Sequence, residues 1–442
     1  MTTPKICLVG DVVVDVSLKT EATSIKLRLG GIIHAARCLW AMSIPYSVGF
    51  FAPSYLDSQI ENYLKAHGCV KSFKLGNIIG CPNVFLIDEV KEIASQGYEF
   101  LLREELKVEV IKDSVEYLSN LTAPDYLFIS GNYDLGELIN AVQGNIHLDI
   151  ANNLKSLDIL HSFRHKLSSI FLSTSSDLFI NFFKDDFKDF AMLFSAFSEK
   201  IILKENRGGS RCYEFAEDKI YFASSQTQLI QHSIGVGDVY DACFIASQPN
   251  HTISQALNLS SWIAAEYAIT TYPDDFKTGV TRVLTSNIND LEAMGGVILT
   301  WESRKLIHIY IAAPDFDYIN SKHIEKVVES LQYHNFSPRR PVKENGQLRS
   351  DSSSKERRNA YLSDLALLDE CSLVVAVNLI DDPGTFIEIG LAAAKGIPII
   401  VYDPYRRATN CMLTETPALV SNDLDDIISQ IFIICANFQK NG

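Results

Sequence analysis

Four side chains near the C-terminal end of the chain have types that suit chemistry at a cationic carbon: Tyr310, Asp364, Asp382 and Glu388. Breaking the bond between a sugar and a base creates an oxocarbenium-like carbon. One carboxylate can stabilise that carbon or bond to it, while a second acid protonates the leaving group. Three carboxylates that share one pocket would therefore suit the cleavage of a glycosidic bond.

The apolar pattern around these residues predicts how they are positioned. Short apolar runs enclose a turn rich in Asp, Pro and Gly, and predict strand, loop, helix and strand at 373–377, 378–385, 386–395 and 396–401. Such a unit requires a parallel pair with a right-handed crossover, and ligands bind at the carboxyl ends of such strands. We expect Asp382 there on the loop and Glu388 in the first turn of the helix. We expect Tyr310 to end the first strand of the same domain.

A purely structural interpretation of the same residues is also available. Thr385 and Glu388 have the spacing of a capping box, with Thr385 as N-cap and Glu388 as the third helical residue. Asp382 and Gly384 could then be turn residues, and Asp364 a solvated carboxylate on a helix. From spacing alone, this interpretation is the stronger one.

A second candidate site is the sequence Gly235-Val-Gly237-Asp238, which opens an apolar helical run. Backbone N–H groups at a helix N-terminus, with glycines that allow close approach, can bind an anion. Asp238 could take a proton from a hydroxyl that attacks a phosphoryl group. Taken alone, the turn favours the simpler interpretation, an ordinary helix N-terminus.

Composition limits the functions that the chain can have. The chain has 442 residues, of which 47% are hydrophobic, and a net charge of −15. This length predicts two or more domains, and the acidic balance argues against a general nucleic-acid binder. The nine cysteines are scattered, no His or Cys group has metal-ligand spacing, and no apolar run reaches membrane-spanning length. We expect a cytoplasmic protein with reduced cysteines, no signal peptide and no metal site.

Short strands alternate with helices along the whole chain, which predicts an α/β fold with mostly parallel sheets. Residues 6–16 predict the first strand. A polar stretch at 274–292 ends the first alternating block, and a second block begins near 305. We therefore predict two domains, 1–295 and 303–442. Residues 335–358 are rich in Ser, Arg, Lys and Pro and predict a mobile surface loop.

The order of motifs in the first domain resembles the ribokinase-like (PfkB) family of sugar and nucleoside kinases, over roughly residues 4–292. The resemblance implies a ribokinase-like α/β sandwich. It assigns sugar binding to an early Asp and a Gly-Gly pair, which match Asp15, Gly30 and Gly31. It assigns the anion hole and the catalytic base to the later turn, namely Gly235, Gly237 and Asp238. ATP and Mg²⁺ would be the cofactors of an active domain.

The first domain departs from this family at several positions. His232-Ser233 stand where the family usually has Asp-Thr, Ala35 where it has Asn, and 173–177 and 204–209 replace its metal-associated and Thr-x-Gly-x-x-Gly stretches. Mg-ATP chemistry needs a phosphate cradle, a metal and a base together, and only the base and part of the cradle are recognisable. We predict that this domain binds a nucleoside or sugar without efficient phosphoryl transfer. An active kinase is the alternative.

The second domain resembles the nucleoside 2-deoxyribosyltransferase family, whose relatives include nucleotide N-glycosidases, over about residues 303–440. The motifs are Ile309-Tyr-Ile-Ala-Ala-Pro, Tyr361-x-x-Asp-Leu, a Val-rich strand, Asp382-x-Gly-Thr-x-x-Glu-x-Gly-x-Ala and Gly396-x-Pro-Ile. The resemblance implies a smaller, doubly wound parallel sheet of Rossmann or flavodoxin type, with no cofactor. It also implies a homo-oligomer in which a neighbour can complete the pocket.

The resemblance to the transferases also implies roles for individual residues. Glu388 matches the nucleophile, Tyr310 supports it, and Asp364 lies near the base as a proton partner. Asp382, followed by Gly384, helps hold the sugar.

This domain departs from its family too. Ser372 replaces an Asp before the Val-rich strand, and Asp315 adds an acid that should face the pocket.

Nucleotide-hydrolysing relatives bind a 5′-phosphate with Ser and Arg donors. This suggests Arg339 and Arg340, beside Ser352 to Ser354, as phosphate ligands. A solvated basic loop is the alternative.

The leading hypothesis is an enzyme that cleaves the N-glycosidic bond of a nucleoside or nucleotide through Glu388 and passes the sugar to water or to another base. The first domain would bind a related nucleoside or sugar. One alternative is a bifunctional protein whose Asp238 still supports phosphorylation. The other is a non-catalytic nucleotide sensor or scaffold whose carboxylates are structural.

Overall fold

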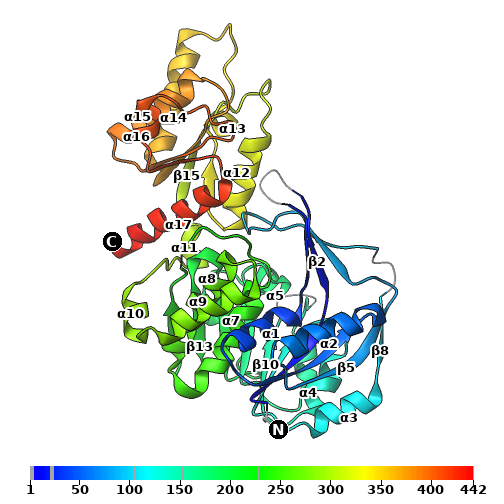
Figure 1. The fold of residues 1–442 in the computed structure, drawn as a ribbon. Helices are drawn as coiled ribbons and strands as arrows, with labels where there is room; N and C mark the ends of the chain where they lie inside the picture. The colour runs from blue at the N-terminus through cyan, green and yellow to red at the C-terminus, as the bar shows by residue number, and fades with distance from the viewer. Residues whose placement is uncertain (1–3, 20–23, 103–105, 151–153, 227, 442) are drawn as a thin grey trace. The chain divides into compact units, whose positions relative to one another are not determined.

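The computed structural model describes residues 4–19, 24–102, 106–150, 154–226 and 228–441. The chain divides into two compact units, Met1–Lys91 with Gln96–Ile298, and Glu92–Ser95 with Leu299–Gly442 (Figure 1). Both units are α/β, which confirms the predicted fold class. Within the described ranges, no helix is long and apolar enough to cross a lipid bilayer.

The first unit is built on a ten-stranded sheet with the order β14-β13-β12-β11-β10-β9-β1-β4-β5-β8. Pairing is parallel from β12 to β5 and antiparallel at both edges. The strands are β1 Ile6–Asp11, β4 Tyr46–Ala52, β5 Lys71–Ile79, β8 Lys107–Val110, β9 Asp125–Ile129, β10 Asn145–Asp149, β11 Ser169–Ser173, β12 Lys200–Lys204, β13 Ser210–Glu214 and β14 Lys219–Ala223.

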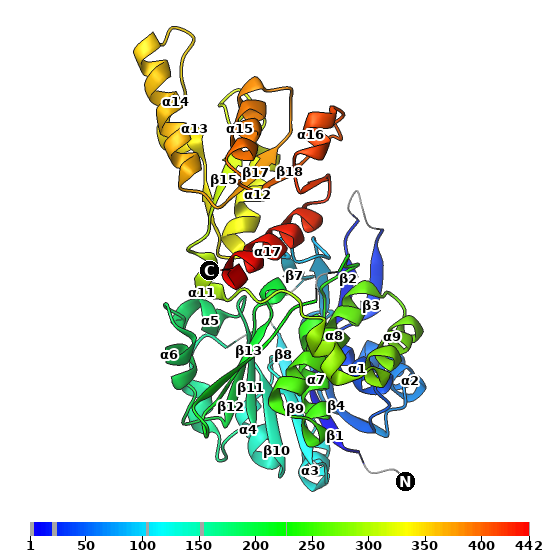
Figure 2. The same ribbon diagram turned by 90° about the vertical axis from the view of Figure 1, so that its left-hand side faces the viewer.

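Helices of the first unit share one large apolar core with this sheet (Figure 2). Buried side chains of α1, α2, α7, α8 and α9 pack together with those of β1 and β4. The helices are α1 Ile32–Ala41, α2 Asp57–Ala66, α3 Lys112–Asn120, α4 Leu135–Ala141, α5 Asp177–Phe182, α6 Phe187–Met192, α7 Val236–Ser247, α8 Ile253–Ile269, α9 Pro273–Thr285 and α10 Ile288–Ala293.

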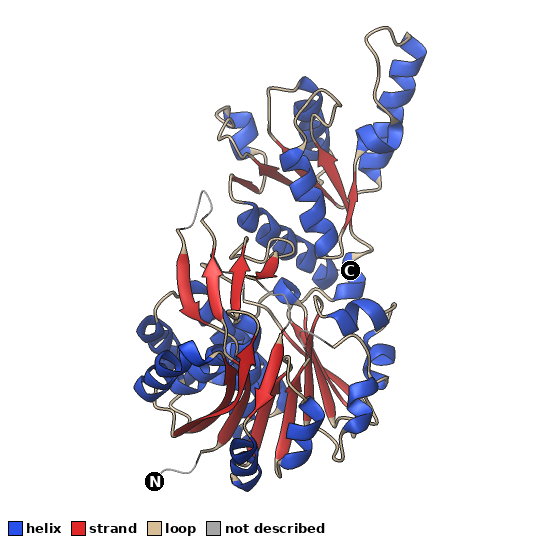
Figure 3. Ribbon diagram, turned by 90° about the vertical axis from the view of Figure 1, so that its right-hand side faces the viewer, coloured by secondary structure: helices blue, strands red, loops and turns tan. Residues whose placement is uncertain are grey.

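The prediction of one strand over 6–16 is wrong. The chain leaves the large sheet after Asp11 and enters a second, four-stranded sheet with the order β3-β2-β6-β7 (Figure 3). Its strands are β2 Val14–Ser17, β3 Lys26–Leu29, β6 Val84–Ile87 and β7 Tyr98–Phe100. The crossing residues are buried, and their amides bond first to Phe51 and then to Asn83, so the chain changes partners without a turn. Asp15 therefore belongs to the second sheet.

The second unit is a five-stranded, all-parallel sheet with the order β16-β15-β17-β18-β19. The strand order reverses between β15 and β17, as in a doubly wound fold. The strands are β15 His308–Ala312, β16 Ser337–Arg339, β17 Leu373–Val377, β18 Ile399–Tyr402 and β19 Leu419–Ser421.

Helices cover this smaller sheet and form its core. Leu367 and Leu368 of α14 and Ile389 and Ala392 of α15 pack with Tyr310 and other strand side chains in one cluster. Helix α12 contacts β16, and α17 contacts β18 and β19. The helices are α11 Trp301–Arg304, α12 Lys322–Tyr333, α13 Pro341–Asn345, α14 Ser354–Asp369, α15 Pro383–Ala394, α16 Cys411–Glu415 and α17 Leu424–Asn441.

The predicted mobile loop at 335–358 is wrong for much of its length, because it contains β16, α13 and the start of α14. Ion pairs explain why this polar segment is ordered. Arg339 bonds to Glu344 and Glu370, and Arg340 bonds to Asp315 and Glu325. The pairs with Asp315, Glu325 and Glu370 tie this polar segment to the loop after β15, to α12 and to the end of α14.

Candidate active site

Helix α15 begins at Pro383, three residues earlier than a cap at Thr385 would allow. Asp382 is the N-cap, and its carboxylate accepts bonds from both the amide and the hydroxyl of Thr385, each at 2.8 Å. Proline is favoured as the first helical residue because its fixed φ suits the helix. The capping-box interpretation of Glu388 is therefore wrong, as is its placement in the first turn. Glu388 lies in the second turn, where it has no capping role.

The side chain of Glu388 meets a tyrosine from the neighbouring strand. The hydroxyl of Tyr310, a fully buried residue of β15, donates a hydrogen bond of 2.7 Å to Oε1 of Glu388. Burial raises the pKa of Glu388 to about 7, the Tyr310 hydrogen bond lowers it, and the charges of Asp364 and Asp382 raise it. Burial and the neighbouring Glu388 carboxylate raise the pKa of Tyr310, so the phenol keeps its proton and stays a donor.

The charge of Asp364 on α14 raises the pKa of both Glu388 and Tyr310, so its carboxylate lies within electrostatic range of them. Its Oδ1 atom accepts a hydrogen bond of 2.8 Å from Nδ2 of Asn345, at the end of α13. Sequence reasoning missed Asn345, since a polar residue next to a glycine indicates only a turn. The structure thus brings together all four side chains predicted for this site.

Gly384 lies in the first turn of α15, beside the carboxylate of Asp382. A Cβ atom at this position would lie 3.1 Å from Oδ2 of Asp382, so a larger residue would crowd the cap. Its assignment to substrate binding stays a prediction.

Arg339 is paired with Tyr310 across β15 and β16, but within the described residues no hydrogen bond or ion pair joins Arg339 or Arg340 to the Glu388 group. Both guanidinium groups are held by carboxylates of the same unit, and neither is a freely solvated loop residue. Asp315 is buried and accepts two hydrogen bonds from Arg340, so this extra acid is paired with a cation, and its facing the pocket stays a prediction. A phosphate bound by these arginines would have to displace or share their present partners.

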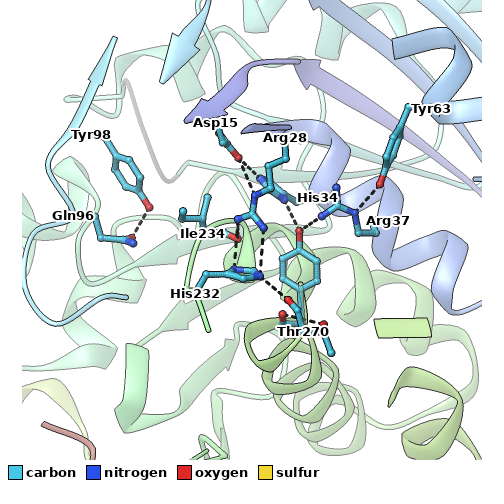
Figure 4. Close-up of polar contacts among 11 residues, drawn as sticks. Asp15, Arg28, His34, Arg37, Tyr63, Gln96, Tyr98, His232, Ile234 and Thr270 are labelled. Atoms are coloured by element: carbon cyan, nitrogen blue, oxygen red, sulfur yellow. Dashed lines mark hydrogen bonds and ion pairs between the residues drawn. The ribbon is translucent and has the colours of Figure 1, made fainter. Parts of the chain in front are cut away.

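In the first unit, the predicted sugar-binding residue Asp15 is surrounded by side chains of the chain itself (Figure 4). Nε2 of His34 donates a hydrogen bond of 3.0 Å to Oδ2 of Asp15, and Nε of Arg28 lies 3.7 Å from the same oxygen. Gly30 borders this carboxylate so closely that a Cβ atom there would overlap it. Arg28 was not singled out from the sequence, although it stands opposite Asp15 in the β2–β3 pairing.

His34 links Asp15 to a buried chain of polar groups (Figure 4). Burial lowers the pKa of His34 to about 4, so its ring is neutral at pH 7. Because Nε2 carries the proton toward Asp15, Nδ1 accepts from the hydroxyl of Tyr267 at 2.6 Å. Nη1 of Arg37 in turn donates to the Tyr267 oxygen at 2.6 Å. His34 is thus a packed, hydrogen-bonded residue.

The glycines of the first unit are required by close approaches. Gly31 has φ of 60° and Gly235 has φ of 73°, values that favour glycine. A Cβ atom at Gly31 would overlap the carbonyl oxygen of Asp11, and one at Gly235 would overlap the His34 ring. Gly237 faces the Nζ atom of Lys204, 3.3 Å from where a Cβ would stand.

Asp238 lies in the first turn of α7 beside a buried lysine. Burial raises the pKa of Asp238 to about 8, Asp149 raises it and Lys204 lowers it. Nζ of Lys204 bonds to Asp241 at 2.7 Å and lies 3.3 Å from Asp149. Burial lowers the pKa of Lys204, but these carboxylates outweigh burial and the net shift is upward.

An ammonium group thus stands where these carboxylates could otherwise hold a cation. In the part of the chain that the structure describes, no group of three His, Cys, Asp or Glu residues is arranged to bind a metal ion. The residues present do not fit the Mg²⁺ of Mg-ATP.

Residues 309–423 match the family model described as nucleoside 2-deoxyribosyltransferase. The second unit contains a nucleoside 2-deoxyribosyltransferase-like domain. The matched range includes Tyr310, Asp364, Asp382 and Glu388, and it confirms the resemblance found in the sequence motifs. In a sequence comparison, no curated protein matches the chain.

Solved structures similar to the chain include three kinases. Arabidopsis thaliana ribokinase complexed with ribose and ATP has a TM-score of 0.48 at 13% identity, covering 65% of this chain and 100% of that one. The tetrameric inhibited form of Escherichia coli phosphofructokinase-2 has a TM-score of 0.47 at 12% identity, covering 64% of this chain and 100% of that one. A pyrophosphate-dependent kinase in the ribokinase family has a TM-score of 0.48 at 13% identity, covering 62% of this chain and 99% of that one. Such low values say nothing about the chemistry of this chain.

Replacing Tyr310 by Phe should raise the pKa of Glu388 above its value of about 7, because the lost hydrogen bond favours the ionised carboxylate. Titration of the ¹³C-labelled glutamate carboxyls by NMR measures the midpoint. Tyr361→Phe, on the exposed part of α14, is the matched control. An unchanged midpoint in Tyr310→Phe would contradict the hydrogen bond.

Replacing Gly235 by Ala should destabilise the first unit more than replacing Gly295 by Ala. Both glycines have φ near 70°, so both substitutions incur the left-handed cost of roughly 1–2 kcal/mol. Only Gly235 faces a ring, and Gly295 has open space. The overlap with His34 should add about 1–3 kcal/mol. Hydrogen exchange of the α7 amides measures the opening free energy, and equal losses at both sites would show that His34 has room to move.

Proposed function

We propose that the chain cleaves the N-glycosidic bond of a nucleoside or nucleotide in its second unit and passes the sugar to water or to another base. The observation that carries the proposal is the hydrogen bond from Tyr310 to Glu388, with Asp364 and Asp382 beside it. Within the described residues, none of these three carboxylates forms an ion pair with a cation, so the site keeps its negative charge for a substrate.

In this proposal, Glu388 is the nucleophile. Tyr310 occupies Oε1, which leaves Oε2 to bond to the anomeric carbon as the bond from that carbon to the base nitrogen breaks. The base leaves with the bonding electron pair, and Asp364 gives it a proton. Water or a second base then attacks the same carbon and releases Glu388, and Asp364 takes up the proton of the attacking group. No cofactor enters these steps.

Asp382 has a narrower part in the proposal. Its Oδ2 atom is committed to Thr385, so Oδ1 is the atom that remains for a sugar hydroxyl. Asp382 would therefore have two roles: as N-cap it fixes the loop, and it also directs a carboxylate oxygen toward the sugar. The site would distinguish ribose from 2-deoxyribose through the hydroxyl that only ribose carries.

For the first unit, we propose binding of a nucleoside or sugar at Asp15. The alternative of an active kinase has less support, because Lys204 occupies the position among the carboxylates and no step through Mg-ATP can be derived from these residues.

We also propose that the chain forms a homo-oligomer. Exposed apolar side chains on α14 and α15 offer a surface for this contact, namely Tyr361, Leu362 and Ile387. Sedimentation equilibrium measures the oligomeric state. A monomer at all concentrations would contradict the proposal.

Glu388→Gln should abolish release of free base from a panel of nucleosides and 5′-nucleotides, with and without an acceptor base. We expect a loss of roughly a hundredfold or more, the scale for removing a reacting group. Glu329→Gln, on the exposed face of α12, should keep full activity. In the wild type, kcat/KM should rise with pH through a midpoint near 7, because only the ionised Glu388 can attack and its pKa is about 7.

Chromatography of the products distinguishes the outcomes. Free base without exchange indicates hydrolysis, and an exchanged nucleoside indicates transfer. If no substrate yields free base while the protein is folded, the glycosidic proposal is wrong and a non-catalytic nucleotide sensor becomes the better account.

A further inference from the structure

Two arginines act on the carboxylate of Asp15: Arg28 lies 3.7 Å from it, and Arg37 interacts with it electrostatically. This arrangement leaves an excess of positive charge. We propose that the first unit binds a small hydroxylated anion, such as a sugar phosphate, with hydroxyl groups on Asp15 and the anionic group on Arg28. The inference rests on the proposed sugar binding of this unit and names the chemical class of the ligand.

Among the residues that the structure describes, Arg28 has one charged partner, and that partner is distant. Its Nε atom lies 3.7 Å from Asp15, longer than a charge-assisted hydrogen bond. Its Nη2 atom donates to the carbonyl oxygen of Ile234 at 3.2 Å and lies 3.5 Å from Nδ1 of His232 (Figure 4). The latter two partners are uncharged. The planar face of the guanidinium and its N–H groups therefore have bonding capacity left.

Arg37 adds a second cation close to the same carboxylate. It donates to the hydroxyls of Tyr63 and Tyr267 at 2.7 and 2.6 Å and forms no ion pair with a carboxylate in the described parts of the chain. Its guanidinium also lies over both tyrosine rings. Arg37 is almost fully buried, so solvent does little to screen its charge.

The remaining titratable groups around Asp15 do not cancel this excess. His34 is neutral with a pKa of about 4, and burial lowers the pKa of His232 well below its ordinary value. Asp238 has a pKa of about 8 and keeps its proton at pH 7. Two cations therefore face one anion. An uncompensated buried charge is unfavourable, and an anionic group on the ligand would relieve it.

The geometry allows both ends of such a ligand to bind. Asp15 and Arg28 are paired residues on neighbouring strands, so their side chains leave the same face of the second sheet. Asp15 uses Oδ2 for His34, and Oδ1 has no partner among the residues described, so it can accept from hydroxyl groups. Arg28 is 21% exposed, which lets an incoming phosphate reach a fork geometry that suits it.

Ligand chemistry also connects the two units. Cleavage of a nucleotide at its glycosidic bond leaves a sugar that still carries its phosphate and its hydroxyls. That product belongs to the class that Asp15 and Arg28 would bind. A nucleoside substrate would instead leave an uncharged sugar, which lacks the group for Arg28.

Isothermal titration calorimetry of the full chain tests the proposal, with Glu388→Gln as background so that the second unit performs no turnover. The probes are ribose 5-phosphate, ribose and inorganic phosphate. We expect ribose 5-phosphate to bind about tenfold or more tightly than ribose, the scale of a charge-assisted bidentate contact. Arg28→Gln should remove this difference, and Arg28→Lys should restore part of it. Lys26→Gln, two residues away on the same strand, should leave it unchanged.

The remaining variants locate the site and separate the two hypotheses. Asp15→Asn should weaken the binding of both ribose and ribose 5-phosphate. Arg28→Gln should weaken the binding of ribose 5-phosphate and leave that of ribose unchanged. If ribose binds as tightly as ribose 5-phosphate, the anionic class is wrong and sugar binding stands. If ribose 5-phosphate binds equally well to Arg28→Gln, its site lies elsewhere. If neither sugar binds while base release still depends on Glu388, sugar binding by the first unit fails and the glycosidic proposal remains.

Discussion

The hydrogen bond between Tyr310 and Glu388 joins the sheet of the second unit to the helix that carries its candidate nucleophile. Tyr310 belongs to β15, which pairs with both β16 and β17, and it packs in the same core as α14 and α15. The position of Glu388 therefore depends on the packing of the whole unit. Burial alone would favour the protonated acid, and the phenol partly reverses this by stabilising the ionised form.

Much of this unit could be predicted from local pattern. The Val-rich strand and the apolar helix were recognisable because a parallel crossover unit has few alternatives, although the helix already begins at Pro383, inside the predicted turn. The cap was not, because both Thr385 and Asp382 are good N-cap residues and spacing does not choose between them. Pro383 decides the matter, since it starts the helix immediately after Asp382. The roles of the four side chains stay predictions, although their proximity is now established.

Other features depended on contacts that the sequence does not display. Residues 335–358 look like a loop by composition, yet Arg339 and Arg340 bind acids from other parts of the unit. The strand predicted over 6–16 continues in a different sheet, because hydrogen-bond partners far along the chain divide it. Arg28 was overlooked for the same reason. Its partners Asp15 and His232 are brought to it by strand pairing and by the loop before α7.

The charges left over at the two sites differ in sign, and this difference follows from which partners each carboxylate has. In the second unit, Glu388 is surrounded by further acids and a phenol, so an ionised site is negative and favours a carbon that becomes positive. In the first unit, Asp15 has arginines around it and a protonated Asp238 nearby, so the site is positive and favours an anion. A fold by itself fixes neither preference. A buried carboxylate serves opposite ends in the two units, because burial removes solvent screening and leaves the neighbouring charges to decide.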